Sequence, residues 1–127
     1  MQRIIVDACG WVAVIDAGIN IDDALLQLLG PSQLLLLPDV EKELIEINSK
    51  RSKKKSLLLK LLKAKTVMID APENSGNHPD DQIISFAINE GIPVLTVDTD
   101  LKRRLFDSGI IIIEVAKNKR LNLIDNL

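Results

Sequence analysis

Two stretches of the chain, PVLTVDTD at residues 93–100 and RIIVD at residues 3–7, share one pattern. Each is a run of aliphatic and β-branched residues, which predicts a short buried strand. Each run stops at an aspartate, Asp98 in the first stretch and Asp7 in the second. Strands of a parallel sheet present their carboxyl ends at one edge. We therefore expect Asp7 and Asp98 to lie close together if these strands are neighbours.

Further strands and helices are predicted on either side of these two stretches. Short apolar runs at residues 34–37, 66–69 and 110–115 add to the strands at 3–6 and 93–97. Helical patterns occupy residues 10–17, 22–29, 39–48, 52–65, 80–90 and 99–107, with Asp39 expected as an N-cap. Residues 71–79 read as a loop, and residues 116–127 receive no assignment. This alternation predicts a three-layer α/β fold, in which a doubly wound, mostly parallel sheet of about five strands is flanked by helices.

Length and composition limit the kind of protein that the chain can form. With 127 residues, of which 46% are apolar, we expect one domain over residues 1–127. No uncharged apolar run of about 20 residues and no signal-peptide pattern is present, so we expect a cytoplasmic protein without a membrane partner. The single cysteine, Cys9, excludes an internal disulfide and is expected to pack as a small core residue.

The helix predicted at residues 80–90 carries an acid on its apolar face. At 100° per residue, Asp80 lies in the middle of the arc formed by Ile83, Ile84, Ala87 and Ile88, with Gln82 and Ser85 outside it. A buried aspartate is costly unless it is paired or binds a metal ion. Asp80 is therefore the strongest single indication of a functional site.

A fourth acid is expected from the helix at residues 39–48, where the periodicity does not separate Glu41 from Glu43. Clustered carboxylates repel one another and need a cation or protons. Oxygen ligands favour Mg²⁺ or Mn²⁺, and such ions promote phosphodiester hydrolysis. The alternative is that Asp7, Asp39 and Asp98 are ordinary helix caps.

Basic residues predict contact with a polyanion. Eight of the 16 basic residues fall between residues 47 and 69, where there is no acid. We expect contacts to RNA phosphates from a set in two helices: Lys53, Lys60, Lys63, Lys102, Arg103 and Arg104. The alternative is a solvated surface. Nucleotide-binding glycine loops and a G-x-S-x-G motif are absent, the one histidine, His78, is expected to be incidental, and Trp11 is expected in the core rather than as a base-stacking platform.

The sequence resembles the PIN-domain ribonucleases in the stretches IIVDACG, LLLLPDVEKELIEI, NHPDDQIISFAINEGIPVLTVD and TDLKRRL. Matched residue by residue, the acids of that family fall on Asp7, Glu43, Asp80 and Asp98, with Asp100 as a further metal ligand. The resemblance implies cleavage of RNA with Mg²⁺ or Mn²⁺, often by a homodimer. The spacing DD-x-x-I-S-x-A and the ending KNKRLNLIDNL look like small archaeal-type members related to endonucleases that process ribosomal RNA.

The chain departs from the pattern of that family at two places. Ala8 and Cys9 stand where small polar residues usually follow the first acid, and Val97 stands where Asn is usual before the last one. No carboxylate is lost, so we expect an active enzyme. Two alternatives remain: a toxin ribonuclease of the VapC type, which would have an antitoxin partner, and a non-catalytic module that binds RNA or protein. A phosphate-accepting receiver domain built around Asp70 fits the sequence less well.

Overall fold

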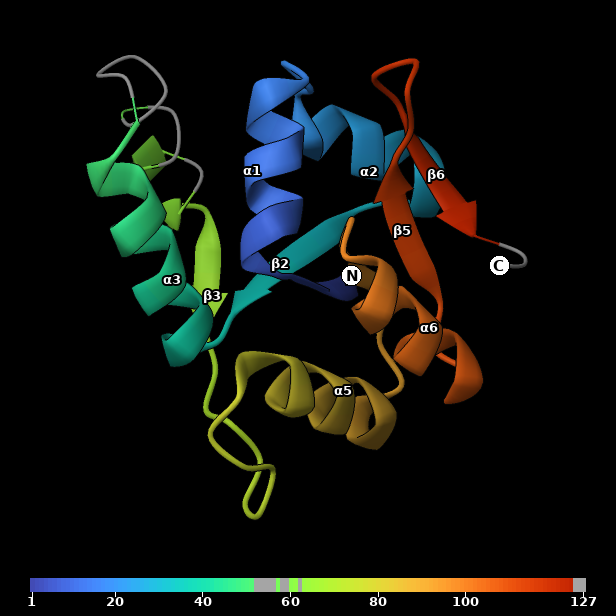
Figure 1. The fold of residues 1–127 in the computed structure, drawn as a ribbon. Helices are drawn as coiled ribbons and strands as arrows, with labels where there is room; N and C mark the ends of the chain where they lie inside the picture. The colour runs from blue at the N-terminus through green and yellow to red at the C-terminus, as the bar shows by residue number, and fades with distance from the viewer. Residues whose placement is uncertain (52–56, 58–59, 62, 125–127) are drawn as a thin grey trace.

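The computed structural model describes residues 1–51, 57, 60–61 and 63–124 (Figure 1). In this part of the chain the sheet has six strands in the order β3-β2-β1-β4-β5-β6. The strands are β1 (Gln2–Val6), β2 (Ser32–Leu36), β3 (Thr66–Met68), β4 (Val94–Leu95), β5 (Ile112–Val115) and β6 (Leu121–Ile124). Every pair is parallel except β5 with β6. The prediction of a doubly wound, mostly parallel sheet is confirmed, with one more strand than expected.

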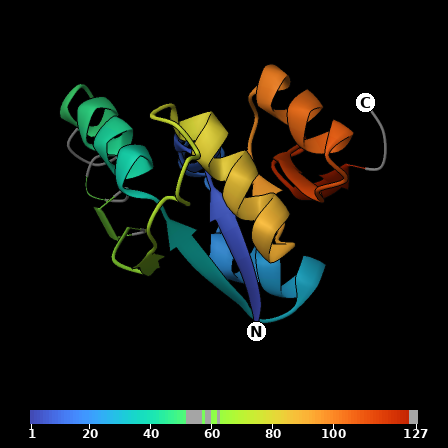
Figure 2. The same ribbon diagram turned by 90° about the horizontal axis from the view of Figure 1, so that it is seen from below.

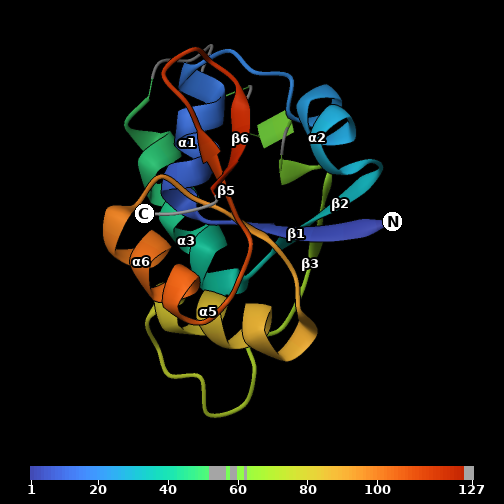
Figure 3. The ribbon, with the colours of Figure 1, turned by 90° about the vertical axis from the view of Figure 1, so that its right-hand side faces the viewer.

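Helices cover both faces of the sheet. They are α1 (Ala8–Asp16), α2 (Ile21–Leu29), α3 (Pro38–Ser49), α5 (Pro79–Glu90) and α6 (Thr99–Asp107). Figure 3 shows β1 in the middle, with α1 and α2 on one side and α5 and α6 on the other. Seen from below, α5 and α6 lie across the strands (Figure 2). None of the helices in the described residues is long and apolar enough to cross a membrane.

The core is built from aliphatic side chains, as the low aromatic content requires. Ile4, Ile5 and Val6 of β1 are fully buried, because β1 lies inside the sheet and is covered on both faces. Trp11 is also in the core, with 0% of its surface exposed, as expected from the sequence. The buried side chains of the strands hold the carboxyl ends of β1 and β4 in place.

Several boundaries differ from the sequence predictions. Leu37, not Asp39, is the N-cap of α3, because Pro38 takes the first helical position, where its missing N–H has no cost. β4 has two residues rather than five. The antiparallel strand β6 was not predicted, since LNLI is too short to stand out from the tail. The helix expected at residues 52–65 lies largely outside the described residues.

The strand order reverses at β1, which has β2 on one side and β4 on the other. In open α/β sheets, ligands bind outside the carboxyl ends of the strands at such a point. Asp7 follows β1, and Asp98 follows β4 by three residues. The fold therefore directs attention to the edge that carries these two acids.

Candidate functional site

Asp7 is the buried anchor of this edge, with only 5% of its surface exposed. It caps α1: its Oδ1 accepts a hydrogen bond of 2.8 Å from the Gly10 N–H. Its Oδ2 accepts hydrogen bonds from Thr96 Oγ1 at 2.6 Å and from Cys9 Sγ at 3.1 Å. Burial raises the pKa of the Asp7 carboxyl, while these three donors oppose the rise.

Gly10 is required by the close approach of α1 to β4. A Cβ at this position would lie 2.7 Å from the Leu95 carbonyl oxygen and 2.8 Å from Asp7 Oδ1. Neither atom belongs to a flexible chain end, so a side chain here would displace the helix or the carboxylate. Gly10 thus lets the helix N-terminus meet the acid that caps it.

Thr96 joins the two strand-end acids. It is fully buried, at 0% exposed, and its Oγ1 donates to Asp7 Oδ2 and accepts from the Asp98 N–H at 3.1 Å. Asp98 in turn caps α6, with its Oδ1 accepting from the Leu101 N–H at 2.9 Å. Thr96 was not predicted from the sequence as a site residue. The available signal was a hydroxyl residue at the end of an otherwise aliphatic strand.

Two further acids come from helices. Asp80 is half-buried in the first turn of α5, and Glu43 lies on the exposed side of α3. Partial burial raises the pKa of Asp80, and the negative charges of Asp98 and Asp81 raise it further. Partial burial also raises the pKa of Glu43, followed by the charges of Asp80 and Asp7. Among the four acids expected from the family pattern, Asp80 is therefore within electrostatic reach of each of the other three.

His78, which was expected to be incidental to the chemistry, has a structural role at the start of α5. Its ring Nδ1 accepts a hydrogen bond of 3.1 Å from the Asp80 N–H, so the histidine is the N-cap of α5. His78 therefore lies directly beside Asp80 at the N-terminus of α5.

Gln82 connects α5 and α3, the two helices that carry Asp80 and Glu43. Only 5% of its surface is exposed, which corrects the prediction that it lies outside the buried face. Its Nε2 donates to Asp39 Oδ2 at 2.9 Å and to the Gly76 carbonyl at 3.1 Å. It links α5 to α3 and to the preceding loop. Ile88, which was expected on the buried face, is 51% exposed.

The donor chemistry of the site suits a hard divalent cation, although its spacing is open. The four acids offer carboxylate oxygens, and their mutual repulsion would be relieved by positive charge. Within residues 1–51, 57, 60–61 and 63–124, however, no three acid, thiol or imidazole groups are gathered closely enough to hold one ion. Mg²⁺ keeps several waters and often takes one or two protein carboxylates. An ion held here would therefore keep several of its water ligands.

Cys9 is not the simple core residue that the sequence predicted. It is half-buried, and its thiol donates to Asp7 Oδ2 and lies 3.6 Å from Thr96 Oγ1. Burial, followed by the charge of Asp7, raises the pKa of the Cys9 thiol to about 11. The thiol acts as a neutral hydrogen-bond donor beside the acids.

The residues expected to bind RNA or metal outside the four acids have varied surroundings. Lys102 pairs with Glu114 at 2.9 Å, Arg104 with Asp81 at 2.5 Å, and Lys63 with Glu41 at 3.9 Å. Lys60, Arg103 and Asp100 are exposed, with Asp100 in the first turn of α6. Lys53 lies outside the described residues. Of these residues, Lys63, Lys102 and Arg104 are therefore engaged by acids of the chain.

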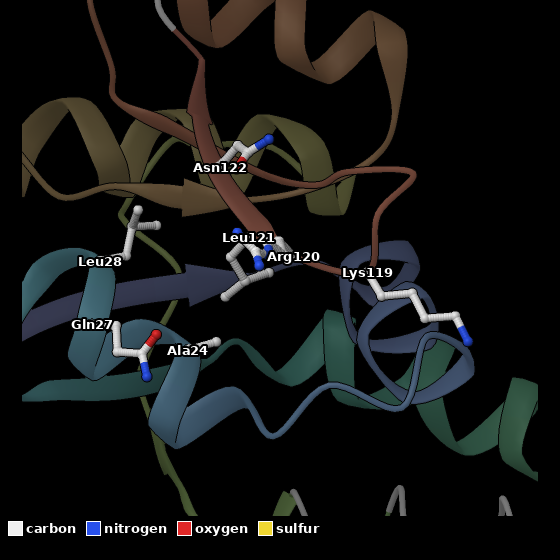
Figure 4. A pocket seen from close by; sticks show the side chains of 7 residues that line it. All are labelled: Ala24, Gln27, Leu28, Lys119, Arg120, Leu121 and Asn122. Carbon is white, nitrogen blue, oxygen red and sulfur yellow. The ribbon is translucent and has the colours of Figure 1, made fainter.

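Two hollows in the surface differ in their relation to the acids. One, of about 480 Å³, lies between α1 and α3 and includes Cys9 and Glu43 in its lining. The other, of about 420 Å³, lies between α2 and β6, with Lys119 and Arg120 at its rim (Figure 4). The second hollow contains none of the four acids.

Comparison with solved structures places this fold among known ones. The structure of the PIN domain endonuclease Utp24 matches with a TM-score of 0.77 and 20% identity, over 98% of this chain and 92% of that one. VapBC2 from Rickettsia felis, bound to a DNA fragment from their promoter, matches with a TM-score of 0.65 and 18% identity, over 89% of this chain and 98% of that one. A protein from Pyrobaculum aerophilum matches with a TM-score of 0.57 and 17% identity, over 81% of this chain and 79% of that one. No curated protein sequence matches the chain.

The sheet order and the acidic edge define an α/β protein of the PIN type. The sequence profile of the PIN like domain matches residues 4–118, which is most of the chain. The protein belongs to the PIN like domain family, as the resemblance predicted.

Proposed function

We propose that the protein is a metal-dependent endoribonuclease that hydrolyses RNA phosphodiester bonds in RNA processing, with Mg²⁺ or Mn²⁺ as cofactor. One observation carries the proposal. Carboxylates from four separate elements of the chain are electrostatically coupled at the edge where the strand order reverses. Such an arrangement destabilises the metal-free protein and is hard to explain unless it serves a cation. Membership of the PIN like domain family supports the same conclusion.

The acids would divide the work between them. Asp7, Asp80 and Asp98, with Asp100 beside them, are proposed to hold the ion, and Glu43 is proposed to face it from α3. A divalent ion held there would polarise a phosphate oxygen and lower the pKa of a water molecule. Thr96 keeps Asp7 and Asp98 in fixed relative positions, and Gln82 keeps α3 against α5.

The substrate would be held by its phosphates. Lys53, Lys60, Lys63, Lys102, Arg103 and Arg104 are proposed to contact the RNA backbone. Arg103 is exposed on α6, the helix that Asp98 caps, so it is the best placed of these cations. The pairs Lys102–Glu114 and Arg104–Asp81 would have to exchange carboxylate for phosphate. A homodimer in the cytoplasm is proposed by analogy with the family.

The test is cleavage of a panel of end-labelled single-stranded RNAs with Mn²⁺, Mg²⁺ or EDTA. Wild type is compared with Asp98→Asn and with Asp107→Asn, a control at the other end of the same helix. We expect metal-dependent cleavage by wild type and by the control, and none by Asp98→Asn. Cleavage that continues in EDTA or in Asp98→Asn would overturn the proposal.

A second candidate is a toxin ribonuclease of a two-gene module. The structural likeness to VapBC2, which covers 98% of that chain, favours it. It predicts that a small protein encoded next to this one binds it tightly and suppresses cleavage. Co-expression of the two genes followed by size-exclusion chromatography tests this prediction.

The third candidate, a non-catalytic module, is motivated by Ala8, Cys9 and Val97, which replace polar side chains beside the acids. It predicts that wild type binds RNA with the same affinity as Asp98→Asn and that neither protein cleaves it. The RNA panel above separates this outcome from the first proposal.

A further inference from the structure

The groove between α1 and α3 has a mostly aliphatic wall. The groove has a volume of about 480 Å³. Its lining includes Val12 and Ala13 of α1, Ile47 of α3, and Val97, which follows β4. All four side chains are only partly buried, whereas the aliphatic residues of β1 beneath them are fully buried. Exposed aliphatic surface in a concave site favours an apolar ligand.

The groove adjoins two of the candidate acids, Glu43 directly and Asp7 through Cys9. Its lining includes Glu43 and Cys9, and the Cys9 thiol donates to Asp7. A group seated in the groove would therefore lie next to any phosphate held at the acids. Ala8, Cys9 and Val97, the positions at which the chain departs from the family pattern, all line this one groove. The departures make the wall beside the acids less polar.

The chemistry of the wall decides what part of a nucleic acid can enter. The described lining contains no lysine or arginine, and its charged members, Asp16 and Glu43, are acids. Asp16 pairs with Arg51, which is not part of the lining, so the lining itself offers a phosphate no cation. A nucleobase, by contrast, has flat apolar faces that can lie between aliphatic side chains. The hollow of Figure 4, with Lys119 and Arg120, has the opposite character and would suit phosphate.

We propose that the groove between α1 and α3 receives one unpaired nucleobase of the RNA strand, adjacent to the phosphodiester bond at the acids. The choice of RNA rests on the proposed function. Because a base inside a duplex cannot reach the groove without being extruded, the groove selects unpaired RNA. Because aliphatic walls form no hydrogen bonds to base edges, it accepts all four bases with weak preference.

The experiment measures binding without cleavage. A short single-stranded RNA with one 4-thiouridine is mixed with the protein in EDTA, its affinity is measured, and the cross-linked peptide is identified after irradiation. We compare wild type with Ala13→Leu, which fills the groove, and with Ala17→Leu, a control at the end of the same helix. Circular dichroism and the melting temperature verify that each variant folds.

We expect wild-type cross-links at residues 8–16, 43–47 or 97, and affinity roughly tenfold weaker in Ala13→Leu but unchanged in Ala17→Leu. Cross-links confined to other segments, equal affinity in all three proteins, or no RNA binding would overturn the proposal. If the protein forms groove cross-links but does not cleave RNA with Mn²⁺, the proposed nuclease function is refuted and the proposed base-binding groove is supported. If the protein cleaves RNA but forms no groove cross-links, the nuclease function is supported and the base-binding groove is refuted.

Discussion

The candidate site has two halves that are built differently. The strand half consists of Asp7, Asp98 and the buried Thr96. Thr96 Oγ1 donates a hydrogen bond to the Asp7 carboxylate and accepts one from the backbone N–H of Asp98. The helix half consists of Glu43 and Asp80, whose pKa values are raised by partial burial and by the charges of neighbouring acids. One half is fixed by the fold, and the other is under electrostatic repulsion.

The difference indicates how such a site can be stable and still reactive. Hydrogen bonds offset the cost of burying Asp7, so the strand half is part of the structure. Repulsion in the helix half is relieved only by protons or by a cation. Substitutions in the strand half should therefore affect stability and activity together, whereas substitutions in the helix half should lower activity alone.

Asp80→Asn should separate the two halves most clearly. We expect cleavage to fall at least about 100-fold, because a proposed metal ligand is lost. The melting temperature of the metal-free protein should not fall, because the repulsion between Asp80 and Asp98 is removed. Kinetic assays and thermal denaturation measure the two effects. Asp81→Asn, which breaks the ion pair with Arg104 and removes a charge near Asp80 but removes no proposed metal ligand, is the control and should retain cleavage.

Gly10→Ala should damage the strand half. The new Cβ would meet the Leu95 carbonyl and Asp7 Oδ1 at less than 3 Å, and overpacking of this kind costs about 1–3 kcal/mol. Urea denaturation measures the loss of unfolding free energy, and cleavage should fall with it. Wild-type stability in Gly10→Ala would contradict the close approach described for α1 and β4.

Thr96→Val keeps the shape of the side chain and removes the donor to Asp7. We expect a loss of about 1–2 kcal/mol in unfolding free energy, because a buried carboxylate loses a hydrogen bond. Thr99→Val, at an exposed position of α6, is the matched control and should cost less. Equal losses in the two variants would mean that the bond to Asp7 contributes little.

The pH dependence of stability should report on the repulsion. The pKa values of Asp7, Glu43 and Asp80 are raised above 3.8, 4.5 and 3.8, so the folded protein binds protons more readily than the unfolded chain does. These three carboxyls therefore lower the free energy of unfolding progressively as the pH rises from the unfolded pKa values through the raised folded ones. In Asp80→Asn the free energy of unfolding should decline less steeply with rising pH. An unchanged decline in urea titrations across this range would contradict the raised pKa of Asp80.

Cys9 should give the smallest effect. Because the pKa of its thiol is raised to about 11, little thiolate forms near neutral pH, and labelling by a thiol reagent should be slow although the side chain is half-buried. Cys9→Ser keeps a donor next to Asp7 and should change unfolding free energy by less than about 1 kcal/mol. Rapid labelling of the folded protein would contradict the environment described for this thiol.

The sequence predicts the fold well because its signals are local and repeated. Aliphatic runs such as residues 3–6 and helical periods such as residues 99–107 each indicate one element, and their alternation implies a parallel sheet. The tail was missed because LNLI gains its strand character from pairing with β5 rather than from its own composition. β4 is shorter than its apolar run because pairing, not hydrophobicity, defines a strand.

The site was predictable only in part, for a physical reason. Acids at strand ends are visible in sequence, whereas their partners depend on three-dimensional contacts. Thr96 reaches Asp7 across 89 residues of chain, and Gln82 reaches Asp39 across 43. The helical periodicity of residues 80–90 assigned Gln82 to the solvent face, because it cannot represent contact with a second helix and a loop.

Calorimetric titration of Mn²⁺ into the metal-free protein tests most directly whether the two halves meet around a cation. We expect binding whose affinity falls as the pH is lowered, since carboxyls with raised pKa must ionise to bind metal. Affinity should fall at least about tenfold in Asp98→Asn and stay unchanged in Asp107→Asn. Absence of binding by wild type, or equal binding by Asp98→Asn, would contradict the proposal that these acids form a metal site.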